Sequence, residues 1–187
     1  KDKKNIIPIK SNYIHSKGLI DNLGLSIKIA LDLNITPKVI EKTIPKIFYD
    51  GRIQYIKKGK LRNFVNKREK LLLDGCHSVE SGSNLYKYLK TLNEPIYGIW
   101  AMQKNKLPKK FLKEFKGIFK KIICVTIPDE PNALDAQELK KIALSNGYIA
   151  EEANNLKNAL KIISSQKPKV ICLFGSLFWV GSALKIN

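Results

Sequence analysis

The sequence predicts an α/β fold, with a Rossmann-like, mostly parallel sheet and flanking helices, preceded by a short helical segment. The chain has 187 residues, of which 44% are hydrophobic and 27% charged, as in ordinary soluble globular proteins. From Tyr49 onward, short apolar runs alternate with helical periodicity, whereas the preceding residues show helical periodicity only. We therefore expect a helical segment over 1–45 and an α/β domain over 46–187.

The first segment is expected to form two helices. Apolar residues recur along one face of the first helix, predicted over 19–33: Leu19, Leu23, Ile27 and Ala30. Thr36 is a candidate cap of the second helix, with Pro37 at its first position, and Pro45 ends it. The pattern predicts a buried first helix. Because two short helices cannot bury both of their faces, residues 1–45 are expected to complete another domain, in which the chain begins midway.

The second segment is expected to alternate strands with helices. Strands are predicted over 52–57, 70–74, 95–101, 121–126, 148–150 and 170–174. Helices are predicted over 80–92, 109–119, 136–145 and 156–165. The apolar run at 71–73, which ends before Gly75, illustrates the strand signal. Such alternation favours a parallel sheet with helices on both faces.

The chain is strongly basic, with a formal charge of +18 and a pI of about 9.8. Only Arg52, Arg62 and Arg68 among the 34 basic residues are arginines, and the lysines are spread along the whole chain. Nucleic-acid readers favour clustered arginine interleaved with aromatic residues. The composition therefore favours the lysine bias of an AT-rich genome over a basic nucleic-acid-binding module, which stays an alternative.

The cysteines and the apolar runs favour a cytoplasmic protein that does not span a membrane. Cys76, Cys124 and Cys172 are far apart and show no paired metal-binding spacing. The longest apolar run, over 170–184, contains two glycines and two serines and is shorter than the roughly 20 residues that a spanning helix needs. The first residues lack the sustained apolar core of a signal peptide.

The first candidate site follows the strand predicted over 70–74. Asp74 stands at the strand end and Gly75 permits a sharp turn. His77 and Ser78 lie at the start of the next helix, where backbone N–H groups favour anions. The alternative is structural, with Ser78 as a helix cap and Asp74 as an Asx-turn residue.

Two further segments are candidates. In Asp50-Gly51-Arg52, an arginine at the junction of the two segments is suited to grip phosphate across a cleft, with a surface ion pair as the alternative. The segment over 174–181 is expected to be a buried strand that runs into a glycine turn, with aromatic residues that favour a core role. A phosphate-binding loop of the type G-x-x-x-x-G-K-[ST] does not occur in the sequence.

These motifs, in this order, resemble the C-terminal region of the dihydrofolate synthase/folylpolyglutamate synthase family, a branch of the Mur ligase superfamily. The segments that carry the resemblance are Asp50-Gly51-Arg52, Leu73-Asp74-Gly75-Cys76-His77-Ser78 and Gly175-Ser176-Leu177-Phe178-Trp179-Val180-Gly181. Segments 20–25, 97–102 and 127–134 agree as well. The likeness covers nearly the whole chain, and it implies that residues 1–45 end a central ATP-binding domain.

The resemblance implies a ligase that uses ATP and Mg²⁺ to phosphorylate a carboxylate of dihydropteroate or folate, which the amine of glutamate then attacks. It maps ATP contacts onto Asn22, Arg52 and Asp74, and places a catalytic residue at His77. The phosphate-binding loop and most Mg²⁺ ligands are expected in a separate N-terminal half, which would be this chain's partner. The excess positive charge would help to attract ATP and polyglutamate, both of which are anionic.

The sequence departs from the family pattern at several positions of its motifs. Asp50, Cys76 and Ser78 replace proline, alanine and asparagine, and Leu19 replaces the glutamine of the first motif. The family's D-K-D motif reads Gln103-Lys104-Asn105, which removes two carboxylates. Two possibilities follow for the chain, a ligase half that is inactive without its partner and a non-catalytic remnant of a split gene.

Overall fold

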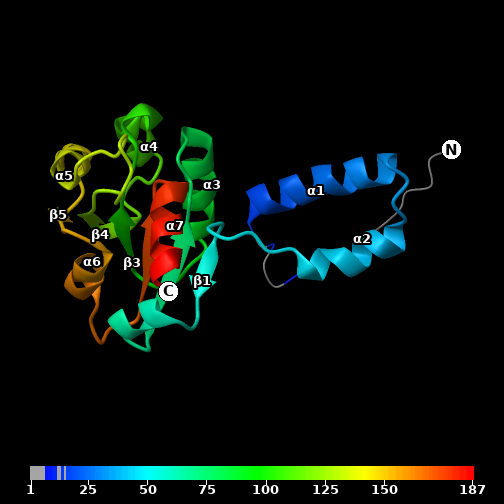
Figure 1. The fold of residues 1–187 in the computed structure, drawn as a ribbon, viewed down its shortest axis with the longest axis horizontal. Helices are drawn as coiled ribbons and strands as arrows, with labels where there is room; N and C mark the ends of the chain where they lie inside the picture. Colours follow the sequence, from blue (N-terminus) through cyan, green and yellow to red (C-terminus); the bar gives the residue numbers. More distant parts are fainter. Residues whose placement is uncertain (1–6, 12–13, 15) are drawn as a thin grey trace. The chain divides into compact units, whose positions relative to one another are not determined.

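The computed structural model describes residues 7–11, 14 and 16–187. The chain divides into two compact units, 1–49 and 50–187, and each is described by itself. Figure 1 shows the helices α1 and α2 of the first unit in blue and cyan, and the sheet of the second unit with its helices.

The first unit contains α1 (Lys17–Asp32), α2 (Pro37–Thr43) and a 3-10 turn, η1 (Ile44–Lys46). Ser16 caps α1, since its hydroxyl accepts a hydrogen bond from the N–H of Leu19. Thr36 occupies the cap position of α2 with Pro37 following it, as predicted, but its hydroxyl makes no capping hydrogen bond. A small core joins the helices through four buried residues: Ile14, Leu23, Ile40 and Ile44.

The prediction that the first helix is buried was wrong for much of its surface. Leu23 is the buried residue of α1, whereas the side chains of Leu25 and Ile29 are 63% and 50% exposed. A helix needs neighbours on several sides to bury a broad apolar surface. In this unit one short helix, α2, packs against α1, so only one side of α1 is covered. The apolar residues on the other side of α1 therefore face solvent in this chain.

In the part of the chain that the structure describes, six strands form one sheet in the order β1-β2-β6-β3-β4-β5. Their bounds are β1 (Gln54–Ile56), β2 (Glu69–Asp74), β3 (Ile96–Trp100), β4 (Phe119–Cys124), β5 (Ala150–Glu152) and β6 (Lys169–Phe174). Strand β1 pairs antiparallel with β2, and every other pairing is parallel. The predicted α/β class with a mostly parallel sheet is confirmed.

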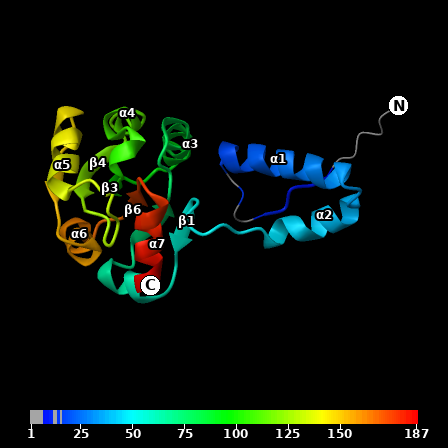
Figure 2. The same ribbon diagram turned by 45° about the horizontal axis from the view of Figure 1, so that its top comes forward.

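Helices cover both faces of the sheet, as Figures 1 and 2 show. One face carries α3 (Val79–Leu89), α4 (Pro108–Lys113) and α5 (Ala136–Ser145), and the other carries α6 (Leu156–Ile163) and α7 (Leu177–Ile186). Successive side chains of β2 point to opposite faces of the sheet and so enter both hydrophobic layers. Leu72 packs with α3 to α5, whereas Leu71 and Leu73 pack with α6 and α7. Each fully buried leucine of this kind contributes about 1.5–3 kcal/mol.

Helix α7 is the main element that the sequence analysis missed. The segment over 174–181 was expected to run from a strand into a glycine turn, but Leu177 already begins a helix that ends at Ile186. The hydroxyl of Ser176 accepts a hydrogen bond from the N–H of Phe178 and so caps this helix. A run that is apolar on all sides does not distinguish a buried strand from a buried helix.

The helix predicted over 109–119 is also shorter than expected. Helix α4 ends at Lys113, and Phe119 begins β4 instead of ending the helix. Between them Gly117 adopts a left-handed backbone with φ of +67°. Glycine takes this conformation without steric cost, so it allows the chain to turn from the helix into the strand.

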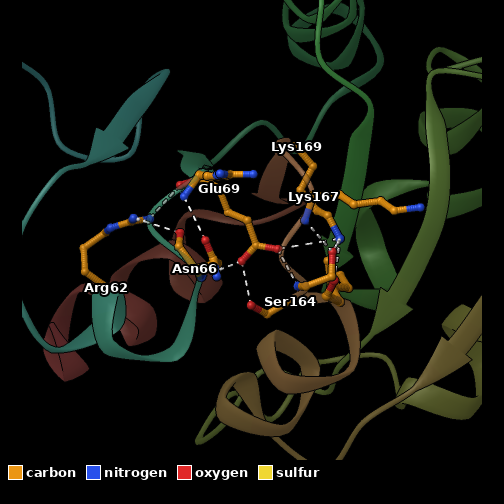
Figure 3. A network of polar contacts seen from close by, with 9 residues as sticks. Arg62, Asn66, Glu69, Ser164, Lys167 and Lys169 are labelled. Atoms are coloured by element: carbon orange, nitrogen blue, oxygen red, sulfur yellow. Dashed lines mark hydrogen bonds and ion pairs between the residues drawn. The ribbon is translucent and has the colours of Figure 1, made fainter.

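A buried acidic residue connects the amino ends of the sheet strands, as the close-up in Figure 3 shows. The Glu69 carboxylate accepts hydrogen bonds from the N–H of Asn66 at 2.7 Å, the hydroxyl of Ser164 at 2.6 Å and the N–H of Ser165 at 2.7 Å. The Nζ of Lys169 lies 3.6 Å from the same carboxylate, and the Glu69 side chain is 0% exposed. This node joins the start of β2 to the loop between α6 and β6.

The buried ammonium group of Lys169 has hydrogen-bond partners of its own. It donates to the carbonyl oxygen of Ile163 at 2.8 Å and to the hydroxyl of Ser165 at 2.7 Å. It also lies 4.6 Å from the centre of the Tyr97 ring, within the range of a cation–π interaction. The buried charge therefore has several partners besides Glu69, which limits the cost of removing it from water.

Candidate functional site

The predicted site residues of the second unit lie where the parallel strands end. Asp74 pairs in register with Phe174, and Phe174 pairs with Trp100, so β2, β6 and β3 end at one edge of the sheet. The loops that follow these strands are therefore neighbours. The chain leaves β2 toward α3 on one face and leaves β6 toward α7 on the other. Such a divergence is a topological switch point, where open α/β sheets bind their ligands.

Asp74 ties this edge to the turn that precedes β1. Its carboxylate accepts hydrogen bonds from the N–H groups of Ile53 and Cys76, each at 2.9 Å. The N–H of Gly75 donates to the carbonyl oxygen of Gly51 at 2.7 Å. Two of these hydrogen bonds, from Ile53 to Asp74 and from Gly75 to Gly51, hold the turn against the loop after β2 and bring the candidate segments 50–52 and 74–78 together.

The Ile53 backbone is strained at this point. Its φ is 46°, in the left-handed region that β-branched residues rarely adopt, and its side chain is buried. The hydrogen bond from Ile53 to the Asp74 carboxylate helps to maintain this conformation, which costs of order 1–3 kcal/mol. The sequence analysis missed Ile53, and no sequence signal marks it, since it acts through its backbone.

Burial raises the pKa of the Asp74 carboxyl above its ordinary value. The hydrogen bond from the Ile53 N–H, the positive charge of Arg52 and the hydrogen bond from the Cys76 N–H all oppose this rise. Arg52 is half-buried and is the basic residue whose charge acts on Asp74. Arg52 is therefore close enough for its charge to act on Asp74, and the binding of phosphate by Arg52 stays a prediction.

His77 lies three residues after Asp74 and is half-buried. Its ring Nδ1 is 2.9 Å from the carbonyl oxygen of Gly75. Since a carbonyl oxygen only accepts hydrogen bonds, Nδ1 carries the proton, which leaves Nε2 of the neutral ring as an acceptor. The N–H of His77 donates to the Ser81 hydroxyl at 3.1 Å, which holds the backbone of this residue in place.

Ser78 takes the structural role that the sequence left open for it. Its hydroxyl accepts from the N–H of Ser81 at 3.2 Å, and the hydroxyl of Ser81 accepts from the N–H of Ser78 at 3.0 Å. These bonds form a capping box at the start of α3. The bond from the Cys76 N–H to the Asp74 carboxylate likewise has the spacing of an Asx turn.

Two glycines permit the close packing of the loops at this edge. A Cβ on Gly75 would lie 2.3 Å from Cδ2 of Leu177, and one on Gly175 would lie 2.4 Å from the carbonyl oxygen of Ala101. Gly175 also has φ of +109°, which side chains disfavour. The first turn of α7 therefore packs against the loop after β2, and a larger residue at Gly75 would separate them, whereas one at Gly175 would clash with the end of β3 at Trp100 and Ala101.

The side chains at this corner include one buried carboxylate, that of Asp74. Both oxygens of Asp74 accept backbone hydrogen bonds, and the described residues contain no cluster of three or more His, Cys, Asp or Glu side chains with metal-binding geometry. Magnesium requires several oxygen ligands in near-octahedral geometry. Asn22, the remaining predicted contact, is an exposed residue of α1 in the first unit.

The comparison with protein families decides the assignment. The profile described as "Dihydrofolate synthetase, C-terminal domain" matches residues 57–186, more than half of the chain. The chain belongs to this family. The resemblance inferred from the motifs is thereby confirmed, and the match extends over the whole sheet from β2 to β6 and over nearly all of α7.

Solved structures share the fold of this dihydrofolate synthetase C-terminal domain at low sequence identity. A Mycobacterium tuberculosis folylpolyglutamate synthase complexed with ADP and AMPPCP has a TM-score of 0.78 and 15% identity, covering 92% of this chain and 40% of its own. An Escherichia coli FolC in complex with DHPP and ADP has a TM-score of 0.73 and 16% identity, and the alignment covers 93% of this chain and 39% of that chain. A Thermotoga maritima folylpolyglutamate synthase has a TM-score of 0.68 and 24% identity, and the alignment covers 92% of this chain and 40% of that chain.

The chain thus spans about 40% of the length of these solved structures. A comparison with curated proteins found no match. A search for membrane-spanning segments found, among the residues that the structure describes, no helix with the length and apolar character to cross a bilayer.

Replacing Asp74 with asparagine is expected to flatten the pH dependence of stability. Because the folded-state pKa of Asp74 lies above its ordinary 3.8, the folded chain binds this proton more tightly than the unfolded chain. Stability therefore falls as pH rises from about 4 through the folded-state pKa. Asparagine does not titrate, so the stability of the D74N chain should fall less over this window. At every pH the D74N chain should also be less stable by about 1–3 kcal/mol, because its amide group leaves one of the two backbone N–H groups without an acceptor.

Urea unfolding of both chains at a series of pH values between about 4 and 7 would measure this difference. A parallel pair of curves, offset by a constant amount, would show that Asp74 does not bind its proton more tightly in the folded chain.

Proposed function

We propose that this chain is the C-terminal half of an ATP-dependent amide ligase that adds glutamate to dihydropteroate or folate. The observation that carries the proposal is the corner at the switch point, where Arg52, Asp74 and His77 lie on segments that the family profile or the family motifs cover. A location in the cytoplasm is part of the proposal, since the substrates and ATP occur there.

The proposed reaction has two steps. A carboxylate oxygen of the folate-type substrate forms a bond to the terminal phosphorus of ATP, and the bond from that phosphorus to ADP breaks. The amine nitrogen of glutamate then attacks the carbonyl carbon of the acyl phosphate. An amide bond forms, the carbon–oxygen bond to phosphate breaks, and the amine loses a proton. Water must be excluded, because it would hydrolyse the acyl phosphate.

Each residue of the corner has a proposed part in these steps. Arg52 neutralises negative charge on the transferred phosphoryl group, for which its planar fork of N–H donors is suited. Asp74 positions the turn that carries Arg52 through its hydrogen bond from the Ile53 N–H, and its charge faces that of Arg52. Nε2 of His77 accepts the proton of the attacking amine, since its Nδ1 is committed to the Gly75 carbonyl.

The partner of this chain in the proposal is an N-terminal half that carries the phosphate-binding loop. Such a loop does not occur in this sequence, and 92% of this chain covers only 40% of a solved structure of the same fold. The partner would also supply the magnesium ligands, which the described residues do not offer. Asn22 in the helical unit is proposed to contact ATP from the central domain that the two halves complete together.

The proposal is tested by mixing the chain with a phosphate-loop-bearing N-terminal fragment of a folylpolyglutamate synthase and measuring ADP release. We expect release that depends on both halves, on the folate substrate and on glutamate, and that saturates at an equimolar ratio. Absence of glutamate-dependent release at every ratio, for fragments that co-purify with the chain, would contradict the proposal.

A non-catalytic remnant is the second candidate, favoured by the loss of two carboxylates at Gln103-Lys104-Asn105. In the structure this loop has local roles, since Gln103 pairs with Ala133 in an isolated bridge and the N–H of Lys104 donates to Asn132. Calorimetry with ATP separates the two candidates, because the variants R52A and D74A should lower the heat of binding in the mixed sample for a ligase half and leave it unchanged for a remnant. A nucleic-acid-binding module would instead show affinity that falls steeply with salt.

A further inference from the structure

Helix α1 carries a second apolar stripe on the side that faces away from α2. Leu25, Ile29 and Leu33, the last at the C-terminal cap, follow one another at intervals of four residues and so lie along one side of the helix. Their side chains are 63%, 50% and 70% exposed. Leu23, which belongs to the small core, is two residues from Leu25 and therefore points to the opposite side. We call Leu25, Ile29 and Leu33 the outer stripe of α1.

The outer stripe has the character of a surface that packs against another element. A surface helix of a soluble protein is apolar on one side and polar on the other, whereas a helix that is apolar on several sides is normally buried. Exposed apolar side chains that adjoin one another mark interaction sites, whereas single ones do not. The charges beside the stripe stay in water, where Lys28 and Asp32 form an exposed ion pair. Helix α1 is thus built to be covered on both of its apolar sides.

The solved folylpolyglutamate synthase structures indicate which element covers the outer stripe. The second unit, residues 50–187, makes up less than three quarters of the chain, whereas the match to the Mycobacterium tuberculosis structure covers 92% of it. Most of the helical unit therefore has a counterpart in that structure. The same match covers only 40% of that chain. The remainder of a chain of this type is the element available to pack on α1.

Asn22 lies on the same side of α1 as the outer stripe. It precedes Leu25 by three residues and Ile29 by seven, which is the spacing of neighbours along one side of a helix. Its side chain is exposed, as the proposed contact with ATP requires. The phosphates of the same ATP need a phosphate-binding loop, which does not occur in this sequence. The polypeptide that supplies the loop must therefore approach this side of α1.

We propose that the outer stripe of α1 is the docking surface for the N-terminal half of the ligase, and that ATP at Asn22 strengthens the docking. This inference rests on the proposed function, from which it takes its partner. A nucleotide that contacts both halves binds the assembled pair more tightly than either half alone. By linkage, the nucleotide raises the affinity of the halves for each other by the same factor. Assembly of the two halves is thus under the control of ATP.

Sedimentation velocity of the full chain, titrated with the phosphate-loop-bearing N-terminal fragment of the ADP-release assay, tests the docking surface. We expect the double variant L25Q/I29Q to raise the Kd of the two halves about 100-fold, because each buried aliphatic side chain contributes about tenfold or more. Glutamine is uncharged and a good helix former, and both replaced side chains are exposed, so the variant is expected to fold. Circular dichroism of the variant chain alone checks its helix content.

The matched control is L144Q/I149Q, which replaces a leucine and an isoleucine of the second unit that are 50% and 67% exposed. This control should leave the Kd unchanged. Saturating ATP should lower the Kd of the wild-type pair about tenfold, and N22A should abolish this effect of ATP without changing the Kd in its absence. A Kd that does not respond to ATP would refute the control of assembly by the nucleotide.

Equal Kd values for the L25Q/I29Q and wild-type chains, or no association of the wild-type chain with the fragment, would overturn the docking surface. So would a dimer of the chain alone that L25Q/I29Q dissociates and the fragment does not, because a second copy would then cover the stripe. ADP release together with unchanged docking by L25Q/I29Q would refute the surface and leave the ligase proposal intact. Docking that depends on the stripe, without any glutamate-dependent release, would support the surface and contradict the ligase.

Discussion

Replacing Glu69 with alanine is expected to lower the free energy of unfolding by about 3–5 kcal/mol. The change removes the acceptor of the Asn66 N–H, the Ser164 hydroxyl and the Ser165 N–H, all within the buried node of Figure 3. It also leaves the ammonium group of Lys169, whose side chain is 7% exposed, without its counter-charge. Urea unfolding followed by circular dichroism would measure the loss.

Two comparisons make this result specific. The matched control is Glu94→Ala, which breaks the more exposed pair between Lys70 and Glu94 and should cost about 0–1 kcal/mol. Combining Glu69→Met with Lys169→Met should recover part of the loss, since no charge is then left unpaired in the interior. A loss for Glu69→Ala no larger than that for Glu94→Ala would show that the node does not stabilise the fold.

Replacing Arg52 with alanine is expected to lower glutamate-dependent ADP release of the assembled halves by about 100-fold to 1000-fold, equivalent to about 3–4 kcal/mol. The physical reason is the loss of a cation that offsets charge on the transferred phosphoryl group. Arg52→Lys should recover only part of the rate, because lysine keeps the charge but lacks the bidentate fork. Steady-state assays at saturating ATP would separate the effect on turnover from an effect on nucleotide binding.

Arg68 offers the matched control for this prediction. It is another of the chain's three arginines, is exposed, and lies in the turn before β2 at the opposite edge of the sheet from Asp74. Arg68→Ala should leave ADP release unchanged. Equal rates for the R52A and R68A chains would show that Arg52 does not stabilise the transferred phosphoryl group.

Prediction from sequence succeeded where a structural signal is local. The loop over 74–78 was placed at a strand end by the apolar run before it, and the strand and the helix after it were found within a few residues of their bounds. Helix α5 was predicted with its bounds correct. The outcome was poorer for α7, since a run of apolar residues has no period that separates a buried helix from a buried strand.

The candidate site shows the same division. Asp74, Arg52 and His77 were recognisable from residue type and motif, whereas the bond from Ile53 to the Asp74 carboxylate was not. That bond depends on a backbone N–H in a left-handed conformation, and any residue type has a backbone N–H. The ATP contacts of Asn22, Arg52 and Asp74 stay predictions, as does the catalytic role of His77.

The sequence by itself determined the α/β class, the alternation of strands and helices up to β6 and the family, because periodicity and motifs depend on residues that are close together in the chain. Only the tertiary structure decided which groups meet. Glu69 and Lys169 are 100 positions apart and pair because β2 and β6 are adjacent in the sheet. The acidic loop at 129–130 and the apolar side of α7 likewise form one cavity only through the packing of α7 on the sheet. Burial and hydrogen-bond partners depend on such distant contacts, which no local pattern records.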